Sequence, residues 1–229
     1  SNLYYHEPQG RLAEAPVARI APGKGFFCNS GAQANEGLFK LARKFGHDEG
    51  RFEIITTINS FHGRTLAGIA ATGQDKVKKG FEPMTPGFHH VPYNDLDAVR
   101  NSISPATAAV LVECIQGEGG LACATPDYLL GLRRLCDERK ILLLLDAVQD
   151  GHYRTGPFQA FQRILEKSGP AGSAFLPDGF SMAKSLGGGF PIGAFWTRSP
   201  YGDLLGPGTH RTTFGGTPLA CAVAIPVLR

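Results

Sequence analysis

The stretch ILLLLDAVQ, residues 141–149, decides the fold class. Its apolar residues follow one another without alternation, which is typical of a strand that is covered on both faces of a sheet. AAVLVECI (108–115) has the same character, and residues 126–139 between the two stretches repeat leucines at helical spacing. Strand and helix patterns alternate in this way along the chain, so the sequence predicts an α/β fold with a mostly parallel sheet and helices on both faces.

The alternation continues outward in both directions. Ser30 is a typical N-cap residue for a helix that Gly46 ends, and EIITTI (53–58) is predicted to be a strand. Toward the C-terminus, PIGAFWT (191–197) has strand character. Residues 163–177 are rich in Gly, Pro and Ser, and we expect them to form a surface loop.

The composition is that of an ordinary globular protein: 229 residues, 42% hydrophobic and 19% charged, with a net charge of +3. This charge is small and no basic run occurs, so neither nucleic acid nor a membrane is an expected partner. The five cysteines are scattered and never spaced as C-x-x-C, which indicates a reducing compartment, with no disulfide and no metal site. The apolar runs are too short to span a bilayer and no leader pattern opens the chain, so we expect a cytoplasmic protein.

Lys184 stands in SMAKSLGGGFPIG (181–193), a stretch of apolar and small residues that continues with three glycines. A lysine buried among such neighbours has a lowered pKa and becomes a nucleophilic amine, of the kind that forms Schiff bases with carbonyl compounds or with pyridoxal phosphate. The alternative is a lysine at the end of a strand or helix whose ammonium group reaches solvent. The stretch alone leaves both interpretations open.

Two further motifs are suited to the charged groups of a ligand. NSGAQANE (29–36) places Ser, Gly and Ala at the start of a helix, where free backbone N–H groups and the helix dipole favour a phosphate, although many helices simply begin in this way. Asp146 ends the apolar strand, where a poorly hydrated carboxylate needs a cation such as a protonated pyridine nitrogen. An aspartate at this position can equally cap the next turn.

Two loops add groups that a cofactor or substrate could use. NSFHGRT (59–65) brings together an aromatic ring that can stack on a planar cofactor and an arginine that can bind a carboxylate with two hydrogen bonds. His62 in this loop either supports the stacked ring or is satisfied within the loop. TTFGGTP (212–218) offers two hydroxyl groups ahead of a Gly-Gly turn, which also suits phosphate oxygens.

In their order and spacing, these motifs resemble the class III (ornithine/acetylornithine type) aminotransferases of fold type I, from Ser1 to Arg229. Within the class, the stretches most similar to acetylornithine aminotransferases are SNLYYHEPQ, FHGRT, ECIQGEGG, DAVQ-x-G-x-x-RTG and AKSLGGGFPIGA. The resemblance implies a fold type I PLP-dependent transferase large domain with pyridoxal 5'-phosphate as its cofactor. We expect residues 1–229 to form this PLP-binding domain, and the family's C-terminal small domain and part of its N-terminal segment to be absent.

The resemblance also implies roles for individual residues. Lys184 is the expected Schiff-base lysine and general acid/base, and Asp146 is the expected partner of the pyridinium nitrogen. The expected cofactor-binding residues are Ser30, Gly31, Ala32, Phe61, Asp146, Val148, Gln149, Lys184 and Thr213. The expected substrate-binding residues are Arg64, Glu118 and Thr212. Glu113 and Glu118 match the two glutamates of the family's E-x-x-Q-G-E motif.

The activity that the resemblance implies is transfer of the terminal amino group of N2-acetylornithine to 2-oxoglutarate, in arginine biosynthesis. Thr213 matches the threonine that in this family binds the phosphate of the neighbouring subunit's cofactor, so we expect a homodimer with shared active sites. The alternatives are another ω-amino donor (ornithine, succinylornithine or 4-aminobutyrate) and a catalytically silent protein that keeps the fold.

Several positions depart from the family's pattern. They are Gln33 for Glu, Cys114 for Pro, Ala147 for Glu, Asp150 for Thr and Thr217 for Asn. The carboxylate lost at Ala147 and the one gained at Asp150 change the charge near Asp146. This change bears on the reaction rate and on which substrate is preferred. Pro226 is expected to kink or end the helix that follows Pro218.

Overall fold

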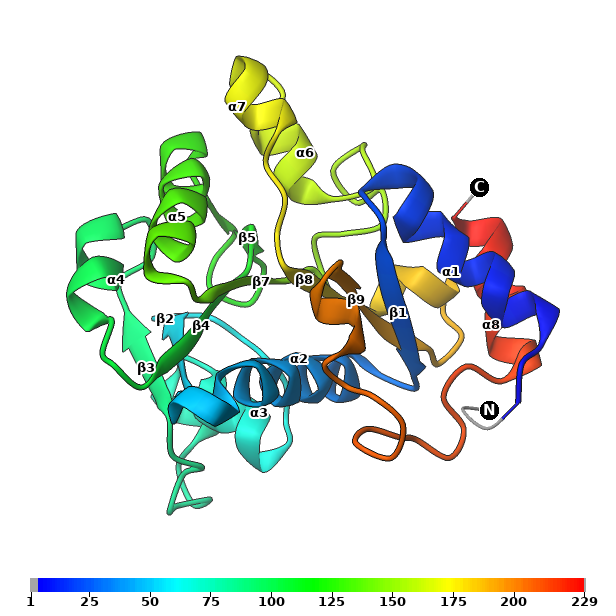
Figure 1. Ribbon diagram of the computed structural model, residues 1–229, viewed down its shortest axis with the longest axis horizontal. Coiled ribbons are helices and arrows are strands. Elements are labelled where there is room, and N and C mark those ends of the chain that lie inside the picture. The colour runs from blue at the N-terminus through cyan, green and yellow to red at the C-terminus, as the bar shows by residue number, and fades with distance from the viewer. Residues whose placement is uncertain (1–3, 229) are drawn as a thin grey trace.

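The computed structural model describes residues 4–228 and consists of a large sheet flanked by helices (Figure 1). Ser1–Leu3, which begin the SNLYYHEPQ motif, and Arg229 lie outside the described residues. Within residues 4–228, the strands of the large sheet are β1 (Gly23–Cys28), β2 (Glu53–Thr57), β3 (Phe88–Val91), β4 (Thr107–Val112), β7 (Leu142–Asp146), β8 (Gly179–Met182) and β9 (Gly193–Arg198). A separate short ribbon pairs β5 (Ile115–Gln116) with β6 (Ala122–Cys123).

The helices lie between these strands in the chain and over the sheet in space (Figure 1). They are α1 (Glu7–Arg19), α2 (Gly31–Gly46), α3 (Leu66–Ala71), α4 (Leu96–Ser102), α5 (Pro126–Arg139), α6 (Ala160–Ile164), α7 (Gly169–Ser173) and α8 (Pro218–Val227). Single turns of 3-10 helix occupy His47–Glu49, Asp75–Val77, Lys184–Gly187 and Tyr201–Asp203.

The sheet has the strand order β1-β9-β8-β7-β4-β2-β3. The pairs from β8 through β7, β4 and β2 to β3 are parallel, whereas β9 is antiparallel to both β8 and β1. The prediction of a mostly parallel sheet is therefore confirmed. The parallel strands end at a common edge of the sheet, where α/β proteins bind their ligands.

Both faces of β7 are buried, which explains why its sequence does not alternate. Leu142 and Leu144 belong to the core cluster that includes α2, while Leu143 and Leu145 belong to the cluster that includes α5. Figure 1 shows α2 and α5 on opposite sides of the sheet. In a half-exposed strand, every second residue is polar. In β7 a polar side chain on either face would lose its hydration, so both faces carry apolar residues.

Most predicted elements are confirmed, and one is wrong. The Ser30 hydroxyl caps α2 by accepting the N–H of Gln33 at 3.3 Å, and α5 has the predicted bounds. The expected loop over residues 163–177 instead contains the end of α6 and all of α7. Its apolar residues provide the reason, because the ring of Phe175 packs 5.2 Å from the ring of Phe161 and holds short helical turns against the core.

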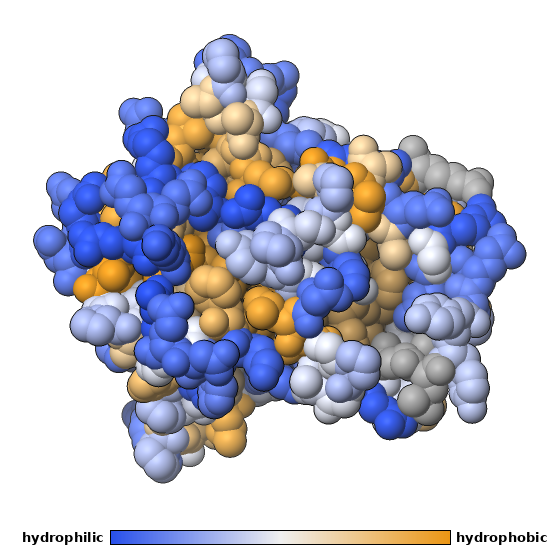
Figure 2. Space-filling model, viewed as in Figure 1, coloured by the Kyte–Doolittle hydropathy of each residue, from blue (hydrophilic) through white to orange (hydrophobic). Residues whose placement is uncertain are grey.

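The first and last helices pack against each other beside β1, so the two ends of the described chain lie on the same side of the molecule (Figure 1). The Arg19 guanidinium at the end of α1 donates to the carbonyl of Leu228 at 2.6 Å. Pro226 lies in the last turn of α8, which ends at Val227, as the proline predicts. Figure 2 shows mainly hydrophilic residues over α4 and α5, and apolar residues toward the middle of the same face.

No helix among residues 4–228 combines the length and the apolar character that a bilayer crossing requires. All five cysteines have free thiols. Within the same residues, no group of His, Cys, Asp and Glu side chains is arranged to hold a metal ion.

Candidate active site

A cavity of about 440 Å³ opens where β4, β7 and β8 end and α2 begins. The predicted site residues that line it are Ser30, Gly31, Ala32, Phe61, Arg64, Asp146, Val148, Gln149 and Lys184. These residues come from four separate segments of the chain. Glu118, Thr212 and Thr213 are not among the described residues that line this cavity.

The start of α2 forms one wall of the cavity. Gly31 and Ala32 are the first residues of the helix, so their N–H groups have no carbonyl partner within it. Gly31 packs so closely that an added Cβ would lie 2.7 Å from a methyl group of Val148. The N–H groups, the helix dipole and the space that Gly31 preserves together make an anion site suited to a phosphate group.

Asp146 lies at the end of β7 and is only 4% exposed. Its Oδ2 accepts a hydrogen bond from Asn35 at 2.7 Å and lies 2.8 Å from Nδ1 of His62. Its Oδ1 accepts the N–H of Val148 and the hydroxyl of Ser181, at 3.1 and 3.2 Å. Burial opposes ionisation of Asp146 most strongly, but the bond and charge of His62 and these other donors hold its pKa below the ordinary value.

Asn35 and His62 are functional residues that the sequence analysis did not assign. Both are buried and line the cavity, and the amide of Asn35 also donates to the carbonyl of His62 at 3.0 Å. Asn35 lies one turn after Gly31 on α2, and this helical spacing is the signal that could have found it. Neither alternative for His62 describes this contact, because its imidazole supports Asp146 at the end of β7.

Glu113 follows β4 and also lines the cavity. Its Oε2 accepts the N–H of Phe61 at 3.1 Å, which ties the loop after β2 to the end of β4. Burial and then the negative charge of Asp146 raise the pKa of Glu113 well above its ordinary value. Glu113 therefore holds its proton more tightly than an ordinary glutamate does.

Lys184 begins the turn that follows β8, and its Nζ donates to Oε1 of Gln149 at 2.7 Å. Of the two interpretations left open for this lysine, the structure agrees with the one in which the amine reaches solvent, because the side chain is exposed at the cavity. The open wall lets water reach the amine from one side. Lys184 has a φ of 45°, a left-handed conformation that costs a non-glycine residue energy and that often marks a functional position.

Phe61 and Arg64 line the cavity from the loop between β2 and α3. The Arg64 guanidinium lies over the Phe61 ring, 5.2 Å from its centre, and Arg64 is exposed. Thr212 lies nearby in the fold without lining the cavity: its hydroxyl accepts a hydrogen bond from Asn29, which does line it, at 3.1 Å. Of the three residues predicted to bind substrate, Arg64 thus lines the cavity, whereas Glu118 and Thr212 do not.

The residues present fit pyridoxal phosphate on the chain's own geometry. The same cavity is lined by an anion site, a buried ionised carboxylate and a primary amine. Buried Nε2 of His62 and Oδ1 of Asn35 have no hydrogen-bond partner among residues 4–228, which indicates that this wall is built for polar contacts. Phe61 and Val148 supply apolar surface for a planar ring.

Comparisons with known proteins give one consistent answer. The family model for class III aminotransferases matches residues 1–229. The chain is 52% identical over its whole length to an acetylornithine aminotransferase of Myxococcus xanthus and 49% identical to one of Pseudomonas putida. Among solved structures, the ornithine aminotransferase of Toxoplasma gondii superimposes with a TM-score of 0.89 over 98% of the chain, at 33% sequence identity.

The chain spans about half the length of these relatives. It covers 56% of the Myxococcus xanthus protein, 55% of the Pseudomonas putida protein and 53% of the Toxoplasma gondii chain. The similarity therefore concerns one continuous portion of each relative.

Proposed function

Because the chain belongs to the class III aminotransferases, we propose that it transfers the terminal amino group of N2-acetylornithine to 2-oxoglutarate. The predicted family is confirmed, and with it pyridoxal phosphate as the cofactor. The proposed donor is supported by curated relatives that are 45–52% identical and carry the name acetylornithine aminotransferase. This activity would belong to arginine biosynthesis.

The bound cofactor would supply an aldehyde that takes up an amine and a pyridinium ring that accepts an electron pair. Lys184 is the residue proposed to hold that aldehyde, because its Nζ is the amine at the cavity. The same amine, once free, can carry a proton between two carbon atoms within its reach. Gln149 orients it by accepting a hydrogen bond from its Nζ.

Asp146 is proposed to hold a proton at the ring nitrogen, because it is ionised and buried. His62 and Asn35 fix its carboxylate in one orientation. Ser30, Gly31 and Ala32 would bind the phosphate, while Phe61 and Val148 would hold the ring between them.

The residues that contact the substrate and the second subunit are further proposals. Arg64, Glu118 and Thr212 would contact the donor, and exposed Thr213 would reach the cofactor of a second subunit. These roles require a homodimer with shared active sites. We also propose that residues 1–229 form the PLP-binding large domain and that the protein works in the cytoplasm.

A single observation carries the proposal: the amine of Lys184 and the ionised carboxylate of Asp146 line the same cavity as the start of α2. The test is the visible absorption spectrum of the purified protein with pyridoxal phosphate, before and after N2-acetylornithine. We expect a band that needs Lys184 and disappears with this donor. Lys184→Ala should abolish both the band and turnover, whereas exposed Lys79→Ala, a matched control, should keep both.

The outcomes separate the parts of the proposal. A band that forms with Lys184→Ala as it does with the wild type would remove the proposed role of the lysine. A band that responds to ornithine or 4-aminobutyrate but not to N2-acetylornithine would keep the cofactor and replace the donor.

A further inference from the structure

Asp150 is a second buried aspartate close to the site, one turn after Asp146. It is 4% exposed, and its Oδ2 accepts the N–H of Ile115 at 2.9 Å. Its Oδ1 is also buried and has no hydrogen-bond partner among residues 4–228. A carboxylate with one oxygen unsatisfied is poorly stabilised in its charged form, so this residue favours the protonated acid.

The groups that face Asp150 are acidic or weakly acidic. They are Asp146 from the end of β7, Glu113 and Cys114 from the end of β4, and Tyr93 from the segment after β3. Burial, opposed by the Ile115 bond and aided by the charge of Asp146, raises the pKa of Asp150 to about 7. Asp150 therefore changes its charge near neutral pH.

Asp150 and Tyr93 hold the same short piece of backbone. The Tyr93 hydroxyl donates to the carbonyls of Glu113 and Cys114, at 2.8 and 3.0 Å, while Asp150 binds the next N–H, that of Ile115. The side chain of Glu113 reaches from this backbone into the cavity wall and binds the N–H of Phe61. A shift of the backbone at 113–115 would consequently move a carboxyl group at the cavity.

We propose that Asp150 is a positioning residue with two states: its carboxyl group holds the 113–115 backbone in both, and in its charged state it also strengthens the hold of Glu113 on its proton. In acid, Asp150 is neutral, and Asp146 is the charged one of the three carboxyl groups. Above neutral pH, a second negative charge joins the cluster, and Glu113 keeps its proton more firmly because a third charge would be strongly disfavoured. The threonine that the family usually has at this position has no such switch.

The sign of the stability effect follows from the direction of the shift. The folded state of Asp150 binds its proton more tightly than the unfolded chain does, with a pKa of about 7 against 3.8. Its stabilising contribution is therefore complete below about pH 4 and is lost as the pH rises through about 7. Asp150→Asn keeps the shape and an acceptor for the Ile115 N–H but has no proton to lose.

The first test compares thermal unfolding of the wild type and of Asp150→Asn at pH 5 and pH 8. We expect the difference in unfolding midpoint, variant minus wild type, to be larger at pH 8 than at pH 5 by roughly 5 °C or more. Asp97→Asn is the matched control, because the Asp97 side chain is 88% exposed, and its difference from the wild type should stay constant. A constant difference for Asp150→Asn would overturn the proposal. Asp150→Thr provides a second uncharged variant if the asparagine variant does not fold.

The second test measures the pH midpoint at which the visible absorbance of bound pyridoxal phosphate changes. It rests on the proposed function, since it needs cofactor in the cavity. Removing the charge of Asp150 should lower this midpoint by roughly 0.3–1 pH unit, because a nearby negative charge favours the protonated form. An unchanged midpoint would overturn the link between Asp150 and the cavity. Failure to bind cofactor would instead count against the proposed function, and the unfolding comparison would still decide on the switch.

Discussion

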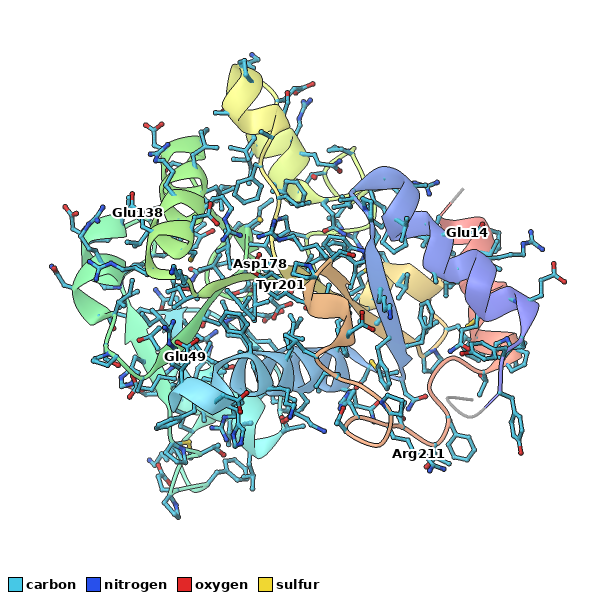
Figure 3. All side chains as sticks on the ribbon, in the orientation of Figure 1. Glu14, Glu49, Glu138, Asp178, Tyr201 and Arg211 are labelled. Atoms are coloured by element: carbon cyan, nitrogen blue, oxygen red, sulfur yellow. The ribbon has the colours of Figure 1, made fainter. Side chains whose placement is uncertain are left out.

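A buried aspartate lies at each end of the parallel strand pair β7 and β8: Asp178 directly precedes β8 at the amino end, and Asp146 ends β7 at the carboxyl end. The two carboxylates are stabilised in different ways. At the amino end, Asp178 accepts hydrogen bonds from Arg133 and Arg198, at 2.9 and 2.7 Å, and from the N–H of Leu143 at 2.6 Å. Figure 3 labels Asp178 in the middle of the molecule beside Tyr201, whose ring lies 5.5 Å from the Arg198 guanidinium. At the carboxyl end, no arginine or lysine within residues 4–228 forms an ion pair with Asp146.

The difference separates a structural charge from a functional one. The charge of Asp178 is neutralised by cations of the same chain, so no cationic group of a ligand is needed at this end of the strands. Asp146 is kept ionised by an imidazole, an amide and backbone N–H groups, and it lines a cavity. A carboxylate that is buried, charged and open on one side is suited to a cationic group of a ligand.

The largest expected effect is on stability at the amino end. Asp178→Asn should lower the free energy of unfolding by roughly 3–5 kcal/mol, because it leaves two partly buried guanidinium groups without their carboxylate. Urea unfolding at neutral pH measures this. Turnover per folded molecule should change little, since Asp178 is remote from the cavity residues.

Asp137→Asn is a suitable control for this variant. Asp137 also forms an ion pair with Arg133, at 2.8 Å, but its side chain is 59% exposed, so its removal should cost less than about 1 kcal/mol. An equal loss in both variants would show that burial of Asp178 is not what makes its pairs valuable.

For Asp146→Asn we expect the opposite result, a large loss of turnover and a smaller loss of stability. The variant removes the charge and keeps the shape, so turnover should fall roughly 100-fold, about 2.7 kcal/mol of lost stabilisation of the charged ring. Its free energy of unfolding should fall less than that of Asp178→Asn, because no arginine or lysine is left unpaired. Steady-state rates and urea unfolding of both variants, measured together, test the comparison. Equal losses of rate and stability in both would contradict it.

The fold could be predicted from the sequence where burial leaves a simple pattern. β7 and β4 are apolar throughout because helices cover both faces, and Ser30 marks the start of α2 because its hydroxyl satisfies a free N–H. The short helices α6 and α7 were not predictable in this way. Their sequence has many turn-forming residues, and it is the packing of Phe161 on Phe175 that stabilises them.

The site was predictable where one short motif contains the reactive group, as with Lys184, Asp146 and the Ser-Gly-Ala turn. It was not predictable where two distant segments create the contact. Asn35 and His62 meet Asp146 only because α2 and the loop after β2 fold onto the end of β7. The exposure of Lys184 likewise depends on which segments surround it.

His62 gives the smallest and sharpest test of how Asp146 is held. The pKa of Asp146 is lowered in the folded state despite its burial, so its contribution to stability is present above about pH 4 and is lost as the pH falls through the folded value. His62→Phe removes a donor to this carboxylate, so we expect a loss of roughly 2 kcal/mol at pH 7 and acid unfolding that begins at a higher pH. His62→Gln, whose amide can donate, should recover part of the loss, and exposed His47→Gln should show none. If the phenylalanine and glutamine variants unfold alike across the pH range, the imidazole fills space beside Asp146 and the hydrogen bond does not keep the carboxylate ionised.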